Sequence, residues 1–554
     1  MNKRESISFD VVIVGAGVAG LSAAISLKQL ACEEGRKVSI VVLEKGAQVG
    51  AHILSGAIIP GFALDHLLPD WCEQGAPLTT IVKASKLSFL SQRQSWTVPE
   101  VLLPPLMRHD RQEFYVGSLG ALTRWLGKQS TGLGVEIYPG FAGAELLYDK
   151  AGALLGVATP DQGLDKRGQP TSNYMQGMEL HGRYILMAEG ARGSLSEQLI
   201  DKFNLRDGRD VAKYALGLKE LWQVSPARHQ SGLVEHFTGW PLSGANSANG
   251  GGFIYHYGDN LISVGMVVHA DYGNPSLSPY DLMQTFKTHP TIKPLFKGAK
   301  RIGYGARTIS AGGWQSLPKL VFPGGALLGC AAGMVNGASM KGTHNAILSG
   351  RDAAFACHKA LQEGRAHDVL QGYQDKLETS EIALDLKAVR NMKPLLSRFG
   401  MALGGAFGCA ALWLEQAGRH NLSLTLSHRK KDRDTLEVRL LHLDESRVYD
   451  QMVTFDKAAS LHLAGVAHAE NQLVHLVFRD PQKQLHNLHH FGLEPAQYYC
   501  PAGVFERRTD EHNKPFIHIS STNCLHCKMC DLKDPADNIG WQVPPKGGPN
   551  YVDM

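Results

Sequence analysis

The chain contains 554 residues, of which 44% are hydrophobic and 19% charged, a composition typical of folded proteins with two to four domains. Its 56 basic and 52 acidic residues leave a net charge of only +4, so nucleic acid is not expected among its partners. Nine cysteines are too few for a disulfide scaffold, which points to a reducing compartment. Five of them are scattered and are expected to be buried free thiols: Cys32, Cys72, Cys330, Cys357 and Cys409.

The first 45 residues have the pattern of a βαβ unit. Residues 11–14 form an apolar run that predicts a strand, residues 21–30 have helical apolar spacing, and residues 38–43 form a second, β-branched run. Glycines interrupt the apolar start and no small-residue cleavage site follows. We therefore interpret the start as a folded N-terminus and not as an export signal.

A glycine fingerprint for a dinucleotide lies within this unit. Gly15, Gly17 and Gly20 follow the first strand and open the helix, where backbone N–H groups and the positive helix end can face a pyrophosphate. A side chain at Gly17 would block the phosphate, and one at Gly20 would hold the helix away from the strand. Glu44 ends the second strand, where a carboxylate can accept a hydrogen bond from a ribose hydroxyl. The motif fits the ADP half of FAD or of NAD.

Two later glycine-rich stretches favour FAD. One recurs at residues 189–193, and another at residues 324–342 precedes a helix expected from about Thr343 to Gln362. This discontinuous arrangement suits a flavin held along its whole length. Between them, residues 211–304 become rich in aromatic residues, glycine and proline, which we interpret as an inserted domain. A small antiparallel layer is expected from three further strands, residues 135–138, 144–148 and 154–159.

Four cysteines gather at the C-terminal end. Cys500 precedes a proline, and two residues separate each of Cys524, Cys527 and Cys530 from the next. Three thiolates so spaced can bind three corners of a [4Fe–4S] cubane, and a remote Cys-Pro can supply the fourth ligand. Zinc, usually held by two Cys-x-x-Cys pairs, and disulfides are the alternatives. Because one of the four cysteines is remote and three are clustered, the pattern favours a single [4Fe–4S] cluster. His526, between the ligands, is expected to face solvent.

Two apolar stretches indicate contact with a membrane surface. The run from Phe399 to Leu414 is rich in small residues, is too short to cross a bilayer, and is followed by a basic cluster at residues 428–433. The second stretch, from Val98 to Met107, contains several prolines. An apolar helix beside cations suits insertion into one leaflet with anionic headgroups. The alternative is that both stretches belong to the core.

The chain resembles the electron transfer flavoprotein–ubiquinone oxidoreductase family over nearly its whole length. The resemblance implies a membrane-associated enzyme that takes electrons from reduced electron transfer flavoprotein, passes them through FAD and a [4Fe–4S] cluster, and reduces ubiquinone to ubiquinol. It rests on these runs of sequence: Gly50-Ala51-His52, Leu54-Ser55-Gly56-Ala57, Gly217-Leu218-Lys219-Glu220-Leu221-Trp222, Lys341-Gly342-Thr343-His344, Cys500-Pro501-Ala502-Gly503-Val504 and Asp531-Leu532-Lys533-Asp534-Pro535.

The resemblance also implies an architecture that combines α/β and α+β parts. We expect a Rossmann-like FAD-binding domain of the glutathione-reductase and p-hydroxybenzoate-hydroxylase type, an inserted ubiquinone-binding domain, and a C-terminal ferredoxin-like [4Fe–4S] domain. The expected boundaries are 1–79, 110–213 and 307–420 for the FAD-binding domain, 80–109 and 214–306 for the ubiquinone-binding domain, and 421–554 for the cluster domain.

Further site residues follow from the resemblance. Asn336 is expected to form a hydrogen bond to the flavin, so its replacement should shift the flavin midpoint potentials without unloading FAD. Gly250 and Gly251 are expected beside the ubiquinone headgroup. The full set of expected cofactor-binding residues is Gly15, Gly17, Gly20, Glu44, Lys45, Ser55, Gly56, Gly329, Asn336 and Thr343.

At three positions the sequence departs from the family pattern. Asn249 stands where relatives carry tyrosine, which alters an expected contact with the quinone headgroup. Met529 and Phe505 stand where relatives tend to carry hydroxyl side chains. Hydrogen bonds to cluster sulfurs raise the reduction potential, and neither side chain can donate one. We therefore expect a lower cluster potential than in relatives with both hydroxyls.

Two other functions remain open on the sequence. An FAD-dependent enzyme similar to geranylgeranyl reductases, acting on a prenyl substrate, would explain the dinucleotide motif but would give the cluster domain no role. A zinc-bound interaction module on an inactive flavin fold is the other alternative. Because no export signal is recognised, we expect the protein on the cytoplasmic face of a bacterial inner membrane, with a mitochondrial origin as the alternative.

Overall fold

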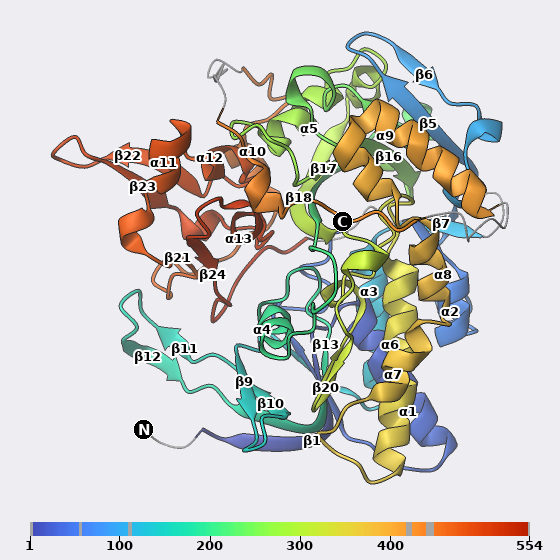
Figure 1. Ribbon diagram of the computed structural model, residues 1–554, viewed down its shortest axis with the longest axis vertical. Coiled ribbons are helices and arrows are strands. Elements are labelled where there is room, and N and C mark those ends of the chain that lie inside the picture. The colour runs from blue at the N-terminus through green and yellow to red at the C-terminus, as the bar shows by residue number, and fades with distance from the viewer. Residues whose placement is uncertain (1–3, 55–57, 109–112, 417–423, 439–447, 552–553) are drawn as a thin grey trace.

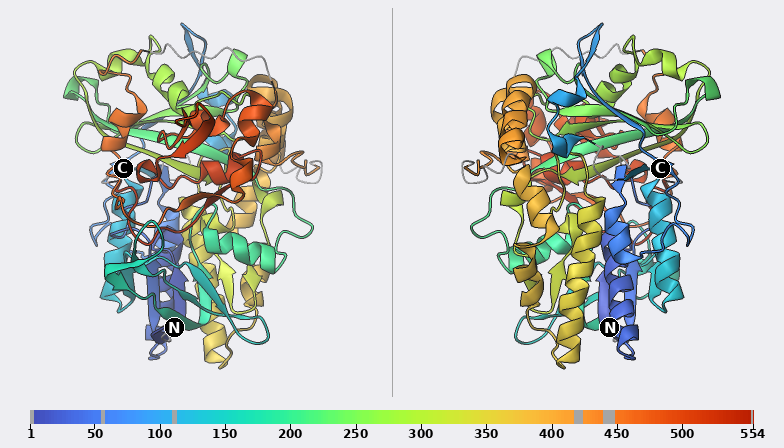
Figure 2. Two further views of the ribbon diagram at one scale, coloured as in Figure 1. Left: turned by 90° about the vertical axis from the view of Figure 1, so that its left-hand side faces the viewer. Right: turned by 90° about the vertical axis from the view of Figure 1, so that its right-hand side faces the viewer.

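The structure is a computed structural model that describes all residues except 1–3, 55–57, 109–112, 417–423, 439–447 and 552–553. Figure 1 shows two layers built on β-sheets, one below the other, with helices α1 and α6 running along the lower layer. The C-terminal part, drawn in red, lies against the upper layer, and the left view in Figure 2 shows it facing the viewer.

The lower sheet has the strand order β19-β20-β13-β1-β2-β8, and β10 and β9 extend it from β13. Pairing from β20 to β8 is parallel, and β9 and β10 form an antiparallel hairpin. The expected βαβ unit and hairpin are therefore confirmed. The expectation that residues 135–138 belong to an antiparallel layer is wrong, because β8 pairs in parallel with β2. The strands are β1 (Ser6–Val14), β2 (Ile40–Glu44), β8 (Glu136–Pro139), β9 (Glu145–Tyr148), β10 (Leu154–Ala158), β13 (Glu179–Met187), β19 (Val321–Phe322) and β20 (Gly325–Leu327).

Helices cover this sheet and bury its apolar strands. α1 follows Gly17 directly and packs along α6, which extends from Thr343 to Gln362 as the sequence pattern predicts. Strands buried on both faces read as continuous apolar runs, which explains the first sequence signal. The helices of this layer are α1 (Val18–Glu33), α2 (Phe62–Leu67), α3 (Leu119–Gly132), α4 (Ser194–Lys202), α6 (Thr343–Gln362), α7 (Gln371–Leu377) and α8 (Glu381–Ala388).

The upper sheet has seven strands in the order β18-β14-β17-β16-β15-β5-β6. Only β15 and β5 pair in parallel, and residues 84–97 join this sheet through β5 and β6. Helix α5 (Pro279–Lys287) packs against it. The strands are β5 (Ala84–Leu90), β6 (Ser95–Thr97), β14 (Tyr214–Gln223), β15 (Leu233–Gly239), β16 (Gly250–Tyr257), β17 (Leu261–His269) and β18 (Lys300–Ser310).

Smaller elements complete these two layers. A three-stranded sheet runs in the order β3-β7-β4, and β11 pairs with β12 in a separate hairpin. Their bounds are β3 (Ile58–Pro60), β4 (Thr80–Ile81), β7 (Phe114–Val116), β11 (Gln162–Leu164) and β12 (Pro170–Met175).

The C-terminal part shares its core with the upper sheet. The Tyr304 hydroxyl in β18 donates to the Pro501 oxygen at 3.0 Å. Buried Arg301 in the same strand donates to Ser460 at 2.7 Å and to Glu220 at 3.2 Å. Its elements are α10 (Lys457–His462), β21 (Leu476–Phe478), α11 (His486–Phe491), α12 (Pro495–Tyr499), β22 (Phe505–Thr509), β23 (Pro515–Ile519), α13 (Met529–Lys533) and β24 (Ile539–Trp541).

Helix α9 (Met392–Gln416) is bent sharply at Gly400, which has a φ of 71°. A Cβ atom at Gly404 would lie 2.5 Å from the Leu395 oxygen, and one at Gly408 would lie 2.3 Å from the Met392 sulfur. The two arms of α9 are therefore packed against each other as a helical hairpin. Residues 381–416 have the length and composition of a membrane span, but this fold-back interrupts the segment.

The scattered cysteines are free thiols, but their burial differs from the expectation. Cys357 is buried, and Cys330 and Cys409 are partly buried. Cys32 and Cys72 are exposed, so the expectation of burial is wrong for these two. Cys32 lies in the last turn of α1, beyond the packed stretch of the helix, and Cys72 lies in the turn after α2.

Candidate functional site

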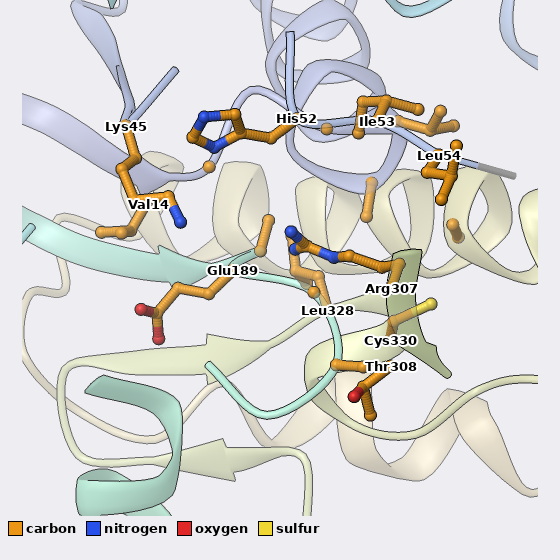
Figure 3. A pocket seen from close by; sticks show the side chains of 18 of the residues that line it. Val14, Lys45, His52, Ile53, Leu54, Glu189, Arg307, Thr308, Leu328 and Cys330 are labelled. Atoms are coloured by element: carbon orange, nitrogen blue, oxygen red, sulfur yellow. The ribbon is translucent and has the colours of Figure 1, made fainter. Parts of the chain in front are cut away.

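A cavity of about 300 Å³ lies where β1, β2 and β13 end. In Figure 3, Lys45 and His52 line one side of it, and Glu189, Arg307 and Cys330 line the other. The turn after β1 and the start of α6 complete the walls. Ligands of open parallel sheets bind at the carboxyl ends of the strands, so this is the expected place for a dinucleotide.

The three glycines of the fingerprint occupy different environments at this cavity. Gly15 has a φ of 108°, and a Cβ there would lie 2.5 Å from the Ala188 oxygen. At Gly20 a Cβ would lie 2.1 Å from the Gly15 oxygen, so α1 could not pack on β1. At Gly17, which lines the cavity, the nearest protein atom would be Ile53 Cδ1, 3.9 Å away. The open side of Gly17 can therefore receive a phosphate.

Glu44 ends β2 with its carboxylate fixed by the backbone. Oε2 accepts from the Ala16 N–H at 3.0 Å, and Oε1 accepts from the Gly46 N–H at 2.6 Å. Burial raises the pKa of Glu44 even though both hydrogen bonds favour the charged form. Its remaining lone pairs are available to accept from a ribose hydroxyl in the cavity.

Three basic side chains also line the cavity, half-buried Lys45 and Arg307 and buried Lys528. Lys45 Nζ lies 3.1 Å from His526 Nδ1 and 5.0 Å from the Trp541 ring centre. Burial, together with Lys528 and Arg307, holds the pKa of Lys45 well below its ordinary value. Arg307 Nη1 is buried and has no hydrogen-bond partner among the described residues. Buried polar groups are almost always paired, so an anionic or carbonyl group of a bound cofactor fits here.

The other expected cofactor-binding residues differ in whether they line the cavity. Thr343 begins α6 and lines the cavity, whereas Gly329 lies outside its wall and donates its N–H to Ser349 Oγ at 2.9 Å. Ser55 and Gly56 lie outside the described residues.

Asn336 is fully buried and bound to protein on both sides. Its Nδ2 donates to Asp385 Oδ1 at 2.7 Å, and its Oδ1 accepts from the Ser339 N–H at 3.0 Å. Asp385 also accepts from Asn345 at 2.8 Å. The neighbouring residue Val335 lines the cavity, but Asn336 does not. Its hydrogen bond to the flavin stays a prediction.

A second cavity, of about 100 Å³, adjoins the first. Its floor is one face of the upper sheet, because the residues that line it alternate along the strands. Burial lowers the pKa of Lys219 in this wall to about 7 and that of His269 to about 3. The sheet residues that alternate on this face are Ala215, Gly217 and Lys219 in β14, Phe253 and Tyr255 in β16, Val267 and His269 in β17, and Arg307 and Ile309 in β18. Leu218 in β14 and Ser310 in β18 also line the cavity, outside this alternation. Both cavities are lined by Leu54, Arg307, Ile309, Val335 and Met340.

Gly250 and Gly251 begin β16 at the edge of this cavity. Gly251 pairs with Val267 and shares its sheet face with Phe253, two residues further on. A Cβ at Gly251 would lie 2.8 Å from the Phe237 oxygen. Gly250 lies on the other face at a φ of 146°. Neither glycine lines the cavity itself, but Gly251 pairs with Val267 and lies two residues before Phe253, and both of these residues line it.

The four C-terminal thiols form the second centre. None is in a disulfide, and Cys524 Sγ accepts from the His526 N–H at 3.4 Å. His526 and Lys528 both have left-handed backbones, with φ of 55° and 62°, so the loop turns back on itself twice. Burial and the nearby Cys500 raise the pKa of Cys524 to about 12. Burial also raises the pKa of Cys527 and that of Cys530, and thiols that resist ionisation in this way fit a positively charged iron centre. The four thiols are those of Cys500, Cys524, Cys527 and Cys530.

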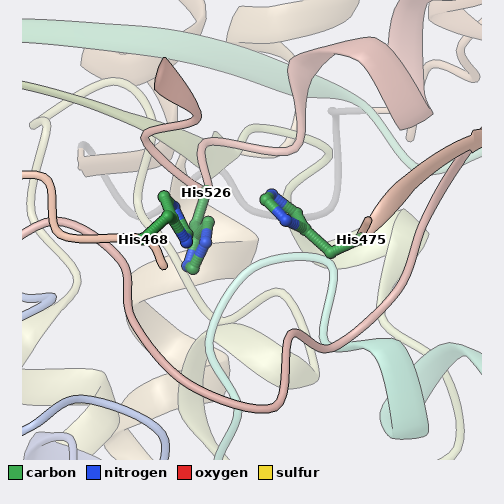
Figure 4. A group of neighbouring side chains, drawn as sticks. All are labelled: His468, His475 and His526. Carbon is green, nitrogen blue, oxygen red and sulfur yellow. The ribbon is translucent and has the colours of Figure 1, made fainter. Parts of the chain in front are cut away.

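His526 is fully buried, so the expectation that it faces solvent is wrong. Its ring packs with those of His468 and His475, with ring centres 4.9 and 5.2 Å away (Figure 4). His468 Nε2 donates to the Cys524 oxygen at 3.2 Å, and its Nδ1 accepts from Gln472 at 3.3 Å. Both nitrogens of His468 are therefore used. Burial lowers the pKa of all three histidines, so they pack as neutral rings at the cysteine loop.

The two apolar stretches form an exposed surface. Leu106 and Met107 pack against Met392 and Leu396 of α9, so the segments are adjacent. The alternative that both stretches are wholly buried is excluded for the side chains that are between 41% and 72% exposed: Val101, Leu102, Phe399, Leu403, Phe407, Trp413 and Leu414.

Sequence reasoning did not identify several residues of these cavities. Arg307 stands in β18, and no motif marks it as one of the residues shared by both cavities. His52 and Lys219 lie within the runs that carry the family resemblance, which was the one available signal. His269 carried no signal, because its partners come from distant parts of the chain.

Comparison with known families gives three matches. Residues 214–309 match the description "ETF-QO, ubiquinone-binding", and residues 451–552 match "Electron transfer flavoprotein-ubiquinone oxidoreductase, 4Fe-4S". Residues 13–74 match an NAD(P)-binding Rossmann-like domain.

Relatives match over the full chain. The electron transfer flavoprotein–ubiquinone oxidoreductase of Pseudomonas aeruginosa is 44% identical over 561 residues, covering 100% of both chains. The probable enzyme of that name from Acinetobacter baylyi is 43% identical, covering 100% of this chain and 99% of its own. The mitochondrial enzyme of Dictyostelium discoideum is 43% identical, covering 100% and 92%.

Two solved structures share the fold. A geranylgeranyl bacteriochlorophyll reductase-like protein from Thermoplasma acidophilum has a TM-score of 0.51 at 14% identity, covering 75% of this chain and 98% of its own. A triple mutant of the flavin-dependent brominase Bmp2 has a TM-score of 0.51 at 14% identity, covering 74% and 98%. At this identity the similarity concerns the fold alone.

Proposed function

The chain belongs to the electron transfer flavoprotein–ubiquinone oxidoreductase family, and we propose that its two adjoining cavities are the FAD site and the ubiquinone site. The enzyme takes electrons from reduced electron transfer flavoprotein and passes them through FAD and a [4Fe–4S] cluster to ubiquinone. The observation that carries the assignment of the cavities is their shared wall of five residues, with Arg307 among them. A quinone in the smaller cavity would be next to a flavin in the larger one.

The larger cavity suits FAD in charge and shape. Gly17 leaves space at the start of α1 for the pyrophosphate, and Glu44 accepts from the adenosine ribose. Thr343 and the N-terminal end of α6 would hold the flavin half, and Arg307 would donate its unpaired N–H to it. The bound flavin supplies two-electron storage, and a cubane held by the four C-terminal cysteines supplies one-electron exchange.

The smaller cavity suits a quinone headgroup. Its walls are mostly apolar, and it sits on the residues that match the ubiquinone-binding domain. Gly251, one strand from the wall at Val267, allows close approach to the backbone. Gly337 and Met340 also line this cavity, and their neighbour Ala338 packs against Met392 of α9. The quinone tail would therefore leave toward the apolar hairpin.

The exposed hairpin of α9 and residues 98–107 form the membrane contact. The exposed apolar side chains of both segments form one surface. Arg398 and the cluster at residues 428–433 supply cations for anionic headgroups. We assign this face to one leaflet on the cytoplasmic side of a bacterial inner membrane. The division into domains at 1–79, 110–213 and 307–420, at 80–109 and 214–306, and at 421–554 is part of the same proposal.

The decisive experiment is turnover of the purified holoenzyme. Reduced electron transfer flavoprotein and a soluble ubiquinone analogue are supplied, and quinol formation is followed while the reduced enzyme is examined by electron paramagnetic resonance. The expected result is quinol formation with a [4Fe–4S] signal. Absence of turnover together with reduction of a prenyl substrate would support the prenyl-reductase alternative, which the family matches do not favour. Zinc in place of iron and sulfide would exclude the cluster.

A further inference from the structure

Reduction of a quinone consumes protons as well as electrons. Each of the two carbonyl oxygens gains one O–H bond, and the electron pair comes from the enzyme's redox groups, so two protons must reach the smaller cavity from water. This inference rests on the proposed quinone site. The cavity is lined largely by apolar side chains, so titratable groups in its wall decide where a proton can come from.

His269 is a wall residue with a buried cation behind it. It ends β17 on the same sheet face as Val267, which also lines the cavity. Its Nδ1 lies 3.0 Å from Nζ of Lys393, which comes from α9, 124 positions away in the sequence. An ammonium can only donate, so Nδ1 accepts this hydrogen bond and the ring proton resides on Nε2.

The chain of contacts continues toward the surface. Lys393 Nζ donates to Asp271 Oδ2 at 2.6 Å, and the exposed residue Ser397 donates to the same oxygen at 2.6 Å. The Lys393 and Asp271 side chains are only 9% and 6% exposed. Asp271 Oδ1 is buried and has no hydrogen-bond partner among the described residues. An unpaired buried carboxylate oxygen is a place where a water molecule would bind.

A third cavity, of about 250 Å³, lies at the outer end of this chain of contacts. Asp271 and Ser397 form part of its wall, and the other lining residues are mostly polar or basic. His269 lines the inner cavity and Asp271 the outer one, and Lys393 bridges them. Titratable groups around Lys393 are Lys213 and Asp432, which pair with each other, and His428 from the same basic loop.

We propose that His269, Lys393 and Asp271 form a proton relay that carries protons from the outer polar cavity to the quinone. The Nε2–H bond of His269 breaks as an O–H bond forms on the quinone oxygen. In the same step Nδ1 takes a proton from the Lys393 ammonium, so no charged imidazole accumulates. Lys393 then regains its proton from bulk solvent through a water at Asp271. Rotation of the His269 ring returns its proton to the side that faces the quinone, which resets the relay for the second proton. The two electrons for the quinone come from the established activity, so atoms and charge balance.

The charges around the relay agree with this order of events. Burial, followed by the charge of Lys393, lowers the pKa of His269 to about 3, so a ring that passes a proton while staying neutral suits the site. Lys393 and Lys213 hold the pKa of Asp271 far below its ordinary value despite its burial, so its carboxylate stays charged and keeps Lys393 oriented. Asp271 is in this respect a positioning residue.

The test uses the full-length holoenzyme with two acceptors. A soluble ubiquinone analogue needs protons, whereas ferricenium takes one electron and no proton. For His269→Gln we expect quinone turnover to fall about a hundredfold or more, in the range of general acid catalysis, with ferricenium turnover unchanged and a larger solvent deuterium isotope effect on the quinone reaction. Asp271→Asn should also lower quinone turnover and leave ferricenium turnover unchanged, but the fall in quinone turnover should be smaller.

A matched control is His289→Gln. His289 is fully buried in the same domain, bonds to the Ser91 oxygen, and lines none of the three cavities. The His289→Gln variant should keep wild-type quinone turnover. Wild-type quinone turnover in His269→Gln, with an unchanged isotope effect, overturns the relay. If His269→Gln does not retain FAD, then Asp271→Asn decides, and full quinone turnover there overturns the relay. Absence of quinone turnover in the wild-type enzyme would instead reject the proposed function.

Discussion

The indole nitrogen of Trp413 in α9 donates to the backbone oxygen of Leu102 across 3.4 Å. This contact joins two segments 311 positions apart, and it explains how two separate apolar stretches form one exposed surface. The Arg108 guanidinium lies 5.7 Å from the Trp413 ring centre, so a cation borders the surface on this side. One continuous apolar surface bordered by a cation suits the proposed insertion into one leaflet.

Val101→Glu should weaken binding to anionic phospholipid vesicles. Val101 is 72% exposed at the edge of this surface, and burying a valine in lipid contributes roughly 1.5 kcal/mol or more, so we expect a loss of about tenfold in vesicle affinity. Vesicle flotation measures it, and turnover with a short-tailed quinone should be unchanged. Val448→Glu is the control, because Val448 is 89% exposed elsewhere. Equal vesicle affinities for the two variants would place the membrane contact elsewhere.

Met529→Thr should raise the midpoint potential of the cluster. Met529 is buried at the start of α13, directly before the ligand Cys530, and its side chain cannot donate to a sulfur. A threonine hydroxyl can do so, and such bonds raise the potential. Met529→Val has nearly the same shape as the threonine variant without the hydroxyl. A redox titration followed by electron paramagnetic resonance should separate the two variants, and equal midpoints would show that the hydroxyl does not reach the cluster.

The fold was largely predictable because its signals are local. The apolar run of β1, the glycines after it and the start of α6 at Thr343 are each visible within a few residues, and local sterics set them. Cys524, Cys527 and Cys530 were equally clear because their spacing is itself the signal. The prediction that His526 faces solvent was wrong because no local sequence signal reports its burial. Its burial depends on His468 and His475, which lie about 50 residues earlier and carry no motif.

The relay and the membrane surface could not be predicted in this form. His269 and Lys393 meet only because α9 packs against the end of β17, and no pattern in either segment marks that contact. Composition identified the two apolar stretches, but not that Leu102 would contact Trp413. Asn336 was expected at the flavin, yet its amide is held by Asp385, a residue that sequence reasoning did not single out.

Glu494→Gln should stabilise the protein above neutral pH. Glu494 is 2% exposed, and burial raises its pKa from 4.5 to about 7, so the folded state keeps a proton that the unfolded state has lost between these pH values. The wild-type free energy of unfolding therefore falls as the pH rises through this window, by roughly 3 kcal/mol at most. The glutamine keeps the hydrogen bond from the Ala496 N–H and avoids this loss.

Calorimetry of the Glu494→Gln holoenzyme at pH 5 and pH 8 measures the effect. We expect a higher melting temperature than wild type at pH 8 and a much smaller difference at pH 5. Glu511→Gln, at an exposed position in the turn between β22 and β23, should match wild type at both pH values. A difference between Glu494→Gln and wild type that does not change with pH would mean that Glu494 acts through packing and not through its proton.

Gly17→Ala and Gly20→Ala should separate cofactor binding from folding. A Cβ at Gly20 would lie 2.1 Å from the Gly15 oxygen, so α1 must move off β1 and the soluble yield should collapse. A Cβ at Gly17 would meet no protein atom closer than 3.9 Å, and the φ of −79° there is open to alanine. Gly17→Ala should therefore fold and keep iron and sulfide but lose FAD, because its methyl group occupies the pyrophosphate position. Flavin, iron and sulfide analysis of the purified variants measures this, and stoichiometric FAD in Gly17→Ala would move the pyrophosphate away from the start of α1.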